Sequence, residues 1–364
     1  MNAVLLDKVK RFAGRKLDAL YGSLFTDLDS IMADMFSRPF ELHFELTNLC
    51  NAKCLFCPYQ FQQRRHEFMP DSVFNKALTD FAAIGGGSVG LTPIVGDALI
   101  DPHFLERVHT LRSCPEVDRI FLTTNAILID RFGAEEIIDA GISSITISTA
   151  GFEEESYRRI YQSASYQRMR DNVVALFEAN EKRGRPVNLA IGLRSDRPLD
   201  QVLRDPDFQP ILRFEPQIDF TWSFTSANGL ITRDILPAGM KFRTAPPKKE
   251  LCVNAVNGPI VLPDGTVLAC SCLGAMDALE DLRIGDITQE SLLEVFTGQL
   301  MRDLRRQFAP GGVLNPTCAG CDAYRDLELY RTREGRERAI LNRRRGSGEV
   351  VHRAGKAKGV FAGG

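Results

Sequence analysis

The chain has 364 residues, of which 44% are hydrophobic and 25% charged, and its formal net charge is −2. This length allows one large and one small domain, each with a buried core. The near-neutral charge excludes the global positive field that gathers nucleic acid, and no segment approaches the roughly 20 apolar residues of a membrane span. Charged residues interrupt the N-terminal apolar runs before a signal peptide can form, so we expect a cytoplasmic protein.

Residues 1–40 form the first segment of the chain. Val4, Leu5, Val9 and Phe12 stand near helical spacing. This pattern predicts one or two amphipathic helices. Packing of these helices on the main domain is preferred to binding at a membrane surface.

Residues 41–230 alternate strand-like and helix-like segments. Strands are predicted at 41–47, 88–95, 118–124, 143–149, 187–194 and 217–224. Helices are predicted near 71–84, 103–113, 131–140 and 165–183. Most strand segments are short apolar runs, which predicts strands that are buried on both faces. The repeated βα units predict a parallel sheet, and six of them predict a partial (β/α)6 barrel rather than a closed barrel of eight.

Three cysteines, Cys50, Cys54 and Cys57, directly follow the first predicted strand. In a reducing compartment, cysteines that cluster along the chain indicate metal binding rather than disulfides. Three thiolates would leave one iron of a [4Fe–4S] cluster without a protein ligand, and an external ligand can bind there. A zinc site is the alternative, although zinc usually takes four ligands in paired C-x2-C spacings.

The C-x3-C-x-aromatic-C arrangement of these cysteines resembles the radical S-adenosylmethionine (SAM) superfamily. The resemblance implies that SAM fills the open iron position with its amino and carboxylate groups. It also implies that Phe56 packs near the adenine. A reducing partner such as flavodoxin or ferredoxin would supply the electron.

Three further segments, each following a predicted strand, are similar to motifs of this family. Gly96-Asp97-Ala98 stands where relatives have Gly-Glu-Pro, and Thr123-Thr124-Asn125 is similar to Thr-Asn-Gly. Ser148 and an arginine, either Arg159 or Arg194, would reach the SAM ribose and carboxylate. The resemblance therefore implies a set of SAM contacts. This set consists of Phe56, Gly96, Asp97, Asn125, Ser148, Arg159 and Arg194.

The pattern of residues 231–330 predicts a small α+β domain, which begins with a proline-rich segment that interrupts the βα alternation. A β-hairpin is expected at 260–269 and a helix at about 289–308. Four cysteines accompany these elements. They are Cys252, Cys270, Cys318 and Cys321. The pattern resembles the auxiliary-cluster domains called SPASM and Twitch, and with no cysteine after Cys321 it implies a single second [4Fe–4S] cluster with all four irons ligated.

Cys272 forms a C-x-C pair with Cys270, and both thiols would face the same side of a strand. The Gly-x4-Cys spacing favours Cys270 as the ligand. A structural zinc knuckle is the alternative for these cysteines. Residues 331–364 form a basic segment whose composition predicts disorder.

The resemblance implies reductive cleavage of SAM to a 5′-deoxyadenosyl radical that removes hydrogen from a substrate. We expect oxidation or a related modification of a small, hydroxyl-rich molecule, with the second cluster accepting an electron. Modification of a peptide or protein side chain is the alternative, and a non-catalytic, metal-stabilised binding protein is the hypothesis from another class. Arg233, Asp234 and Arg243 precede Cys252 and are candidates for catalytic residues.

Overall fold

The computed structural model describes residues 33, 35–91, 94–245, 247–270 and 279–327. The predicted N-terminal helices fall largely outside these residues, and the predicted disordered tail at 331–364 falls wholly outside them. Among the described helices, none is both long and apolar enough to cross a bilayer.

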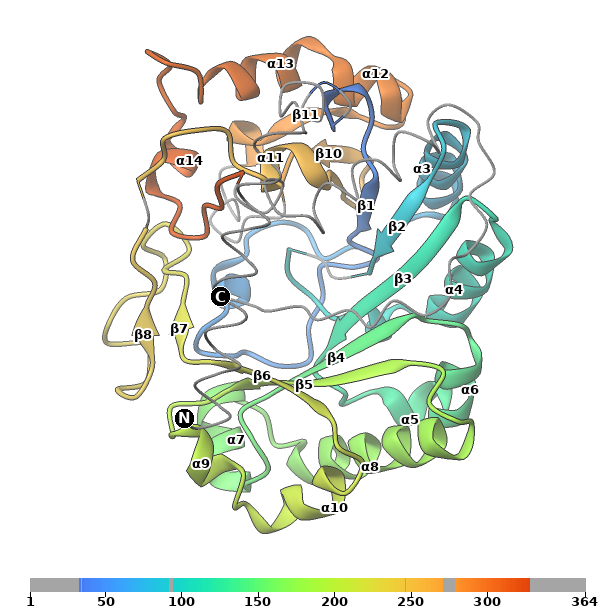
Figure 1. The fold of residues 1–364 in the computed structure, drawn as a ribbon, viewed down its shortest axis with the longest axis vertical. Coiled ribbons are helices and arrows are strands. Elements are labelled where there is room, and N and C mark those ends of the chain that lie inside the picture. The colour runs from blue at the N-terminus through green and yellow to red at the C-terminus, as the bar shows by residue number, and fades with distance from the viewer. Residues whose placement is uncertain (1–32, 34, 92–93, 246, 271–278, 328–364) are drawn as a thin grey trace, which may run out of the picture.

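The main element of the fold is a curved nine-stranded sheet with the order β11-β10-β9-β1-β2-β3-β4-β5-β6 (Figure 1). Strands β1 to β6 are parallel to their neighbours. They are β1 (Glu41–Phe44), β2 (Gly87–Gly90), β3 (Val117–Thr124), β4 (Ser144–Thr149), β5 (Asn188–Arg194) and β6 (Gln217–Thr221). All six predicted strands of the first domain are therefore present, and the partial barrel is confirmed.

The strands are not all buried on both faces, so that expectation is wrong for β1, β3, β4 and β6. In β4, Ile145 and Ile147 are buried, whereas Thr146 and Ser148 are partly exposed. An incomplete barrel explains this alternation, because no opposite strands fill its interior. The inner face of the sheet is consequently open and polar.

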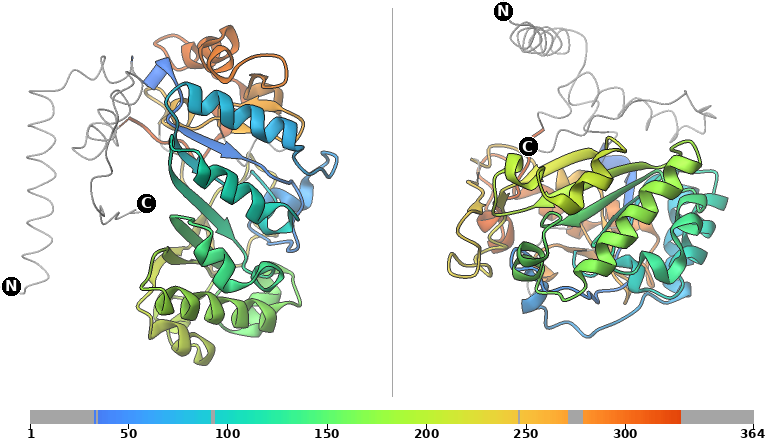
Figure 2. Two further views of the ribbon diagram at one scale, coloured as in Figure 1. Left: turned by 90° about the vertical axis from the view of Figure 1, so that its right-hand side faces the viewer. Right: turned by 90° about the horizontal axis from the view of Figure 1, so that it is seen from below.

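Helices cover the outer face of the sheet, and Figure 2 shows them side by side along it. They are α3 (Asp71–Ala83), α4 (Phe104–Ser113), α5 (Ile129–Phe132), α6 (Ala134–Asp139), α7 (Glu154–Tyr161), α8 (Tyr166–Lys182), α9 (Leu199–Val202) and α10 (Gln209–Leu212). Short 3-10 helices lie at η1 (Pro58–Phe61), η2 (Ala98–Ile100) and η3 (Pro206–Phe208). The sequence prediction lacked α7, and it joined α5 and α6 across Gly133, whose φ of +90° interrupts the helix.

The predicted hairpin of the second domain extends the barrel sheet. Strand β9 (Ile260–Val261) pairs in parallel with β1, and β10 (Thr266–Leu268) and β11 (Arg283–Asp286) follow in antiparallel order. Gly265, with a φ of +93°, forms the turn between β9 and β10. One sheet therefore runs through the expected domain boundary at about 230.

The core is continuous across this junction as well. Ile260 and Leu292 of the second domain belong to the same buried cluster as Leu42 and Val89 of the barrel. A hydrogen bond of 2.9 Å from the Leu292 amide to the Asp80 carboxylate joins the two parts at the surface. The remaining elements are β7 (Ser223–Phe224), β8 (Lys241–Phe242), α11 (Asn254–Asn257), η5 (Leu279–Asp281), α12 (Leu292–Thr297), α13 (Gln299–Arg306) and α14 (Pro316–Gly320).

The predicted helix at 289–308 consists of two helices, α12 and α13. The first begins after Ser291, whose side chain forms a capping box with Glu294. The two helices meet at Gly298, which has an extended backbone. The capping box decides the start of α12, because it satisfies amide groups that have no partner inside the helix.

Candidate functional site

Cys50, Cys54 and Cys57 lie together in the loop that follows β1. Burial raises the pKa of Cys50 to about 12 and that of Cys57 to about 11. The pKa of Cys54 is raised by burial and then by the other two thiols, which places the three sulfur atoms within short electrostatic range. Such thiols ionise when metal binding displaces their protons. Three thiols on one loop fit three corners of a [4Fe–4S] cluster and leave the fourth iron open.

The cysteine loop is pinned to the end of α7. The amides of Lys53 and Leu55 donate to the carbonyls of Tyr161 and Ile160 at 3.1 and 2.9 Å. Because these bonds run along the backbone, they hold the path of the loop regardless of its side chains.

A buried ion pair closes the same loop over the end of β1. The Glu45 carboxylate is fully buried and accepts from the Arg64 guanidinium at 2.6 and 3.0 Å. It also accepts from the Val95 amide at 3.3 Å. Burial raises the pKa of Glu45, and Arg64 opposes that shift. The bidentate geometry fixes where the loop returns to the barrel.

A buried polar network links the loops after β2 and β3 to the first cysteine. The Asp97 carboxylate accepts from the Thr124 hydroxyl at 2.9 Å and from the Asn125 amide at 2.8 Å. The Asn125 side chain donates to Asn51 at 2.6 Å and to the Cys50 sulfur at 3.8 Å. Asp97 therefore uses its carboxylate to position Asn125, and Asn125 lies directly against the cysteine loop.

Replacing Asn125 by alanine is expected to lower the reduction potential of the first cluster. The amide donor stabilises the negative charge that gathers on sulfur when a cluster is reduced, so its loss should shift the potential by tens of millivolts. Redox titration followed by electron paramagnetic resonance (EPR) measures this shift. Asn180→Ala is the matched control, because Asn180 is an equally buried amide that bonds only to Val187. Equal potentials in both variants and wild type would contradict the assigned bond.

Gly96 brings the loop after β2 close to the cysteine loop. Its φ is +101°, and a Cβ at this position would lie 2.5 Å from the Thr47 carbonyl oxygen and 2.8 Å from that of Leu49. A side chain would therefore collide with backbone that cannot move without displacing the cysteines. The glycine of the predicted motif thus has a structural reason, and a SAM contact through its backbone stays a prediction.

Phe56 and Ser148 both contact Tyr161, a residue that the sequence analysis did not single out. The Phe56 ring lies 5.5 Å from that of Tyr161 and 5.2 Å from that of Phe224. The Tyr161 hydroxyl shares a hydrogen bond of 2.8 Å with the Ser148 hydroxyl. The available signal was the spacing of Tyr157 and Tyr161, which places both rings on one face of a helix, where they stack.

The two predicted arginines differ in their partners. Arg159 forms a bidentate ion pair with Asp196 and is about half exposed. Arg194 donates to the Thr221 hydroxyl at 2.9 Å, and burial lowers its pKa. No ion pair with a carboxylate joins Arg194 to the rest of the described chain. Arg159 is thus engaged by a carboxylate and Arg194 is not, and a contact of either arginine with SAM stays a prediction.

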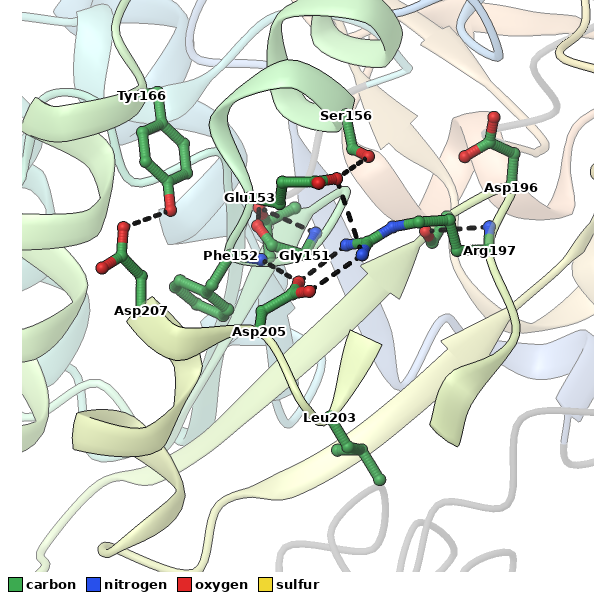
Figure 3. A network of polar contacts seen from close by, with 12 residues as sticks. Gly151, Phe152, Glu153, Ser156, Tyr166, Asp196, Arg197, Leu203, Asp205 and Asp207 are labelled. Atoms are coloured by element: carbon green, nitrogen blue, oxygen red, sulfur yellow. Dashed lines mark hydrogen bonds and ion pairs between the residues drawn. The ribbon is translucent and has the colours of Figure 1, made fainter. Parts of the chain in front are cut away.

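A second network joins the loops that follow β4 and β5, the strands that contain Ser148 and Arg194 (Figure 3). Arg197 forms a bidentate ion pair with Asp205 at 2.7 and 2.8 Å, and Asp205 also accepts from the Phe152 amide at 3.1 Å. Gly151 lies against this pair, and a Cβ there would approach Asp205 to 3.2 Å. The loops after β4 and β5 are thus locked together at the barrel edge.

The four C-terminal cysteines line one cavity. Cys252, Cys270, Cys318 and Cys321 share it with apolar side chains such as Leu282 and Phe308. Burial raises the pKa of Cys318 to about 12, and the charges of Cys252 and Cys321 add to the shift. The four cysteines therefore line the same cavity although Cys252 is distant in sequence from the others. Four thiols around one cavity fit a fully ligated cluster.

Helix α14 holds Cys318 and Cys321 against the barrel. The Asn315 side chain caps the helix by accepting from the Cys318 amide at 2.7 Å. The Asp322 carboxylate accepts from the Ser226 amide at 2.6 Å, in the segment that follows β7. The second cysteine group is therefore attached to the chain that leaves the barrel mouth.

Cys270→Ala is expected to remove the second cluster, whereas Cys272→Ala should retain it. Cys270 lines the cavity, and Cys272 lies outside the described residues. Iron content and the EPR signal of the second cluster measure the outcome, and each variant serves as the control for the other. Loss of the cluster in Cys272→Ala alone would reverse the assignment.

The three candidates for catalytic residues occupy different environments. Arg233 donates to backbone carbonyls of its own loop, at 2.7 Å for Met240, and Asp234 accepts from Thr232 at 2.6 Å on the surface. These hydrogen bonds give the side chains of Arg233 and Asp234 a structural role in their own loop. Arg243 donates to the Ser223 carbonyl at 3.2 Å and lies near Arg194. A catalytic role for any of the three stays a prediction.

The sequence profile of the radical SAM superfamily matches residues 44–204, and that of an iron–sulfur cluster-binding domain, SPASM, matches residues 252–322. The chain belongs to the radical SAM superfamily. The first match contains all three cysteines of the barrel loop, and the second contains all four that line the cavity. This radical SAM enzyme binds a [4Fe–4S] cluster and SAM through its barrel and an auxiliary [4Fe–4S] cluster through its SPASM domain.

Curated relatives of this radical SAM enzyme match it in part. The GTP 3′,8-cyclase of Psychromonas ingrahamii is 26% identical over 187 residues, which cover 50% of this chain and 54% of the relative. The molybdenum cofactor biosynthesis protein moc-5 of Caenorhabditis elegans is 28% identical over 195 residues, which cover 49% of this chain and 31% of the relative. The chain thus spans about half the length, or less, of these relatives.

Solved structures of other radical SAM enzymes share the fold. BtrN in complex with AdoMet and 2-DOIA superposes with a TM-score of 0.51 at 14% identity, covering 78% of this chain and 92% of BtrN. Streptococcus suis SuiB bound to precursor peptide SuiA gives 0.54 at 14% identity, covering 79% and 70%. The enzyme anSMEcpe with bound AdoMet gives 0.52 at 16% identity, covering 84% and 97%. At these identities the likeness concerns the fold.

Proposed function

We propose that this enzyme cleaves SAM reductively at the three-cysteine site and removes hydrogen from a small, hydroxyl-rich molecule, which it oxidises or modifies. The number of thiols at each site carries the proposal. Three cysteines leave one iron open to SAM, whereas four around one cavity close the second cluster to exchange. When bound, the clusters and SAM supply the electron transfer and the 5′-deoxyadenosyl radical, and the auxiliary cluster accepts an electron.

The chain's own residues orient SAM at the barrel edge. Arg194 would bind the carboxylate, because its planar fork has no carboxylate partner among the described residues. Phe56 would pack against the adenine, and Ser148 would donate to the ribose after its bond with Tyr161 rearranges. The apolar rings beside the cysteine loop would exclude water from the reacting atoms.

The polar inner face of the barrel supports a hydroxyl-rich substrate. Thr146 and Ser148 of β4 and Thr221 of β6 lie partly exposed on this face. Hydroxyl groups both donate and accept hydrogen bonds, so they match the hydroxyls of a polyol. BtrN, solved with AdoMet and 2-DOIA, supports the proposal through its shared fold.

Modification of a peptide is the second candidate. Strand β6 is the last strand at one end of the described sheet, and its free edge would accept an extended peptide as an added strand. SuiB, which was solved with a precursor peptide, shares the fold. The relatives named GTP 3′,8-cyclase add a nucleotide as another substrate class, with cyclisation in place of oxidation.

Deuterium transfer would test the proposal. Anaerobically reconstituted enzyme, reduced by flavodoxin or ferredoxin, would be given SAM with carbon-deuterated cyclitols, nucleotides or peptides. We expect deuterium in 5′-deoxyadenosine with the cyclitols. Transfer from peptides alone would favour the second candidate. No 5′-deoxyadenosine from iron-loaded, reduced protein would indicate the non-catalytic binding protein.

A further inference from the structure

Two guanidinium groups lie near each other at the end of β6. Arg194 donates to the Thr221 hydroxyl at 2.9 Å, and Arg243 donates to the Ser223 carbonyl at 3.2 Å. Thr221 and Ser223 are two residues apart, so in extended chain their positions differ by about 7 Å. Arg243 also contributes to lowering the pKa of Arg194, after burial, which agrees with this proximity.

Neither guanidinium forms an ion pair with a carboxylate of the described chain. Other partly buried arginines of the barrel do form one, as Arg64 does with Glu45 and Arg197 with Asp205. Asp219, opposite Gly192 in the register of β5 and β6, raises the pKa of Arg194 more than Arg243 lowers it, but Asp219 forms no ion pair with Arg194. Two like charges in a partly buried site repel each other, and a bound anion would relieve that repulsion.

The pair faces the inner side of the barrel. Ser148 stands opposite Gly192 in the register of β4 and β5, and a Cβ at Gly192 would lie 3.4 Å from an Arg194 nitrogen. Arg194 therefore covers the inner face beside Ser148. Arg243 follows β8, in the segment that leads from the barrel to Cys252.

We propose that Arg243 binds an oxyanion of the substrate, a carboxylate or a phosphate, beside the Arg194 that binds SAM. This inference rests on the proposed function, since it places the substrate between the two clusters. A planar guanidinium donates two parallel hydrogen bonds to either oxyanion. The substrate is accordingly a hydroxyl-bearing molecule with an anionic group.

Calorimetric titration of the reconstituted, SAM-bound enzyme with inorganic phosphate, and separately with acetate, tests the proposal. We expect one of them to bind wild type, and Arg243→Gln to weaken that binding about tenfold or more, because a charge-assisted hydrogen bond is lost. Phosphate binding without acetate binding would assign a phosphate, and the reverse a carboxylate. Arg243→Lys, which keeps the charge and loses the fork, should bind with intermediate affinity.

Lys241→Gln is the matched control, because it removes an equal charge two residues before Arg243, in β8, where Lys241 lies 4.8 Å from the Trp222 ring. We expect it to bind the oxyanion as wild type does. Equal loss in Lys241→Gln and Arg243→Gln, or no oxyanion binding by folded wild type, would overturn the inference. SAM cleavage by wild type is measured in parallel: cleavage without oxyanion binding refutes the inference alone, and oxyanion binding without cleavage refutes the proposed function.

Discussion

Replacing Cys318 and Cys321 together by alanine is expected to abolish product formation while 5′-deoxyadenosine continues to form. Both thiols line the auxiliary cavity with Cys252 and Cys270, so their loss leaves two ligands, too few to retain the cluster. The cysteines that serve SAM cleavage lie on a different loop, after β1. Product and 5′-deoxyadenosine are measured separately in the same anaerobic reaction.

Cys114→Ala is the control for this experiment, because Cys114 lies at the end of α4, outside both cysteine groups. Circular dichroism would establish that the double variant folds. Product formation at the wild-type rate would show that the second cluster is structural. Loss of 5′-deoxyadenosine in a folded variant with an intact first cluster would mean that the two sites are coupled.

The second large effect is expected at the first site. Replacing Cys50, Cys54 and Cys57 together by alanine should remove about four of about eight irons and reduce SAM cleavage to the uncatalysed background. The open iron that binds SAM disappears with its cluster, and the auxiliary site, with four thiols, leaves no iron open to SAM. Iron and sulfide analysis with chromatography of 5′-deoxyadenosine gives both results.

The EPR signal of the auxiliary cluster is the internal control for the triple variant. Its persistence would show that the fold and the second site survive. SAM cleavage by a triple variant that lacks the first cluster would disprove the assignment. Zinc in place of iron at the second site, with activity intact, would disprove the auxiliary cluster.

Local patterns predicted most of the fold. The six parallel strands and helices α3, α4 and α8 follow from short-range periodicity and from turn residues. Helix α7 was missed because its segment, Glu154–Tyr161, is strongly polar, and its packing depends on two tyrosines a turn apart. The pairing of β9 with β1 was also missed, since the hydrogen bond from the His43 amide to the Pro259 carbonyl joins residues too far apart in the chain to leave a local pattern.

The residues of the candidate site likewise fall into two groups: those that local sequence patterns predict, and those that only tertiary contacts identify. The barrel cysteines could be predicted as one group because their spacing is local and thiols have a specific chemistry, whereas Cys252 and Cys318 come to one cavity only in the folded chain. The choice between Arg159 and Arg194 depends on Asp196, which pairs with the first and leaves the second free of a carboxylate partner in the described chain. Glu45 and Arg64, 19 residues apart, likewise pair only in the folded chain. Residue types predict the chemistry, and tertiary contacts decide which copy of a residue performs it.

The parallel pairing of β1 with β9 has a consequence for protein synthesis, because β1 is made long before its partner strand. Phe44 leaves the ribosome long before Val261, its partner in the register. Until then one edge of β1 has unpaired backbone groups, and exposed edges invite association with other chains. Cys50 lies six residues after Phe44, so the nascent chain carries three unligated thiols beside an open edge. We therefore expect the first cluster to be loaded after β9 of the auxiliary hairpin has paired with β1.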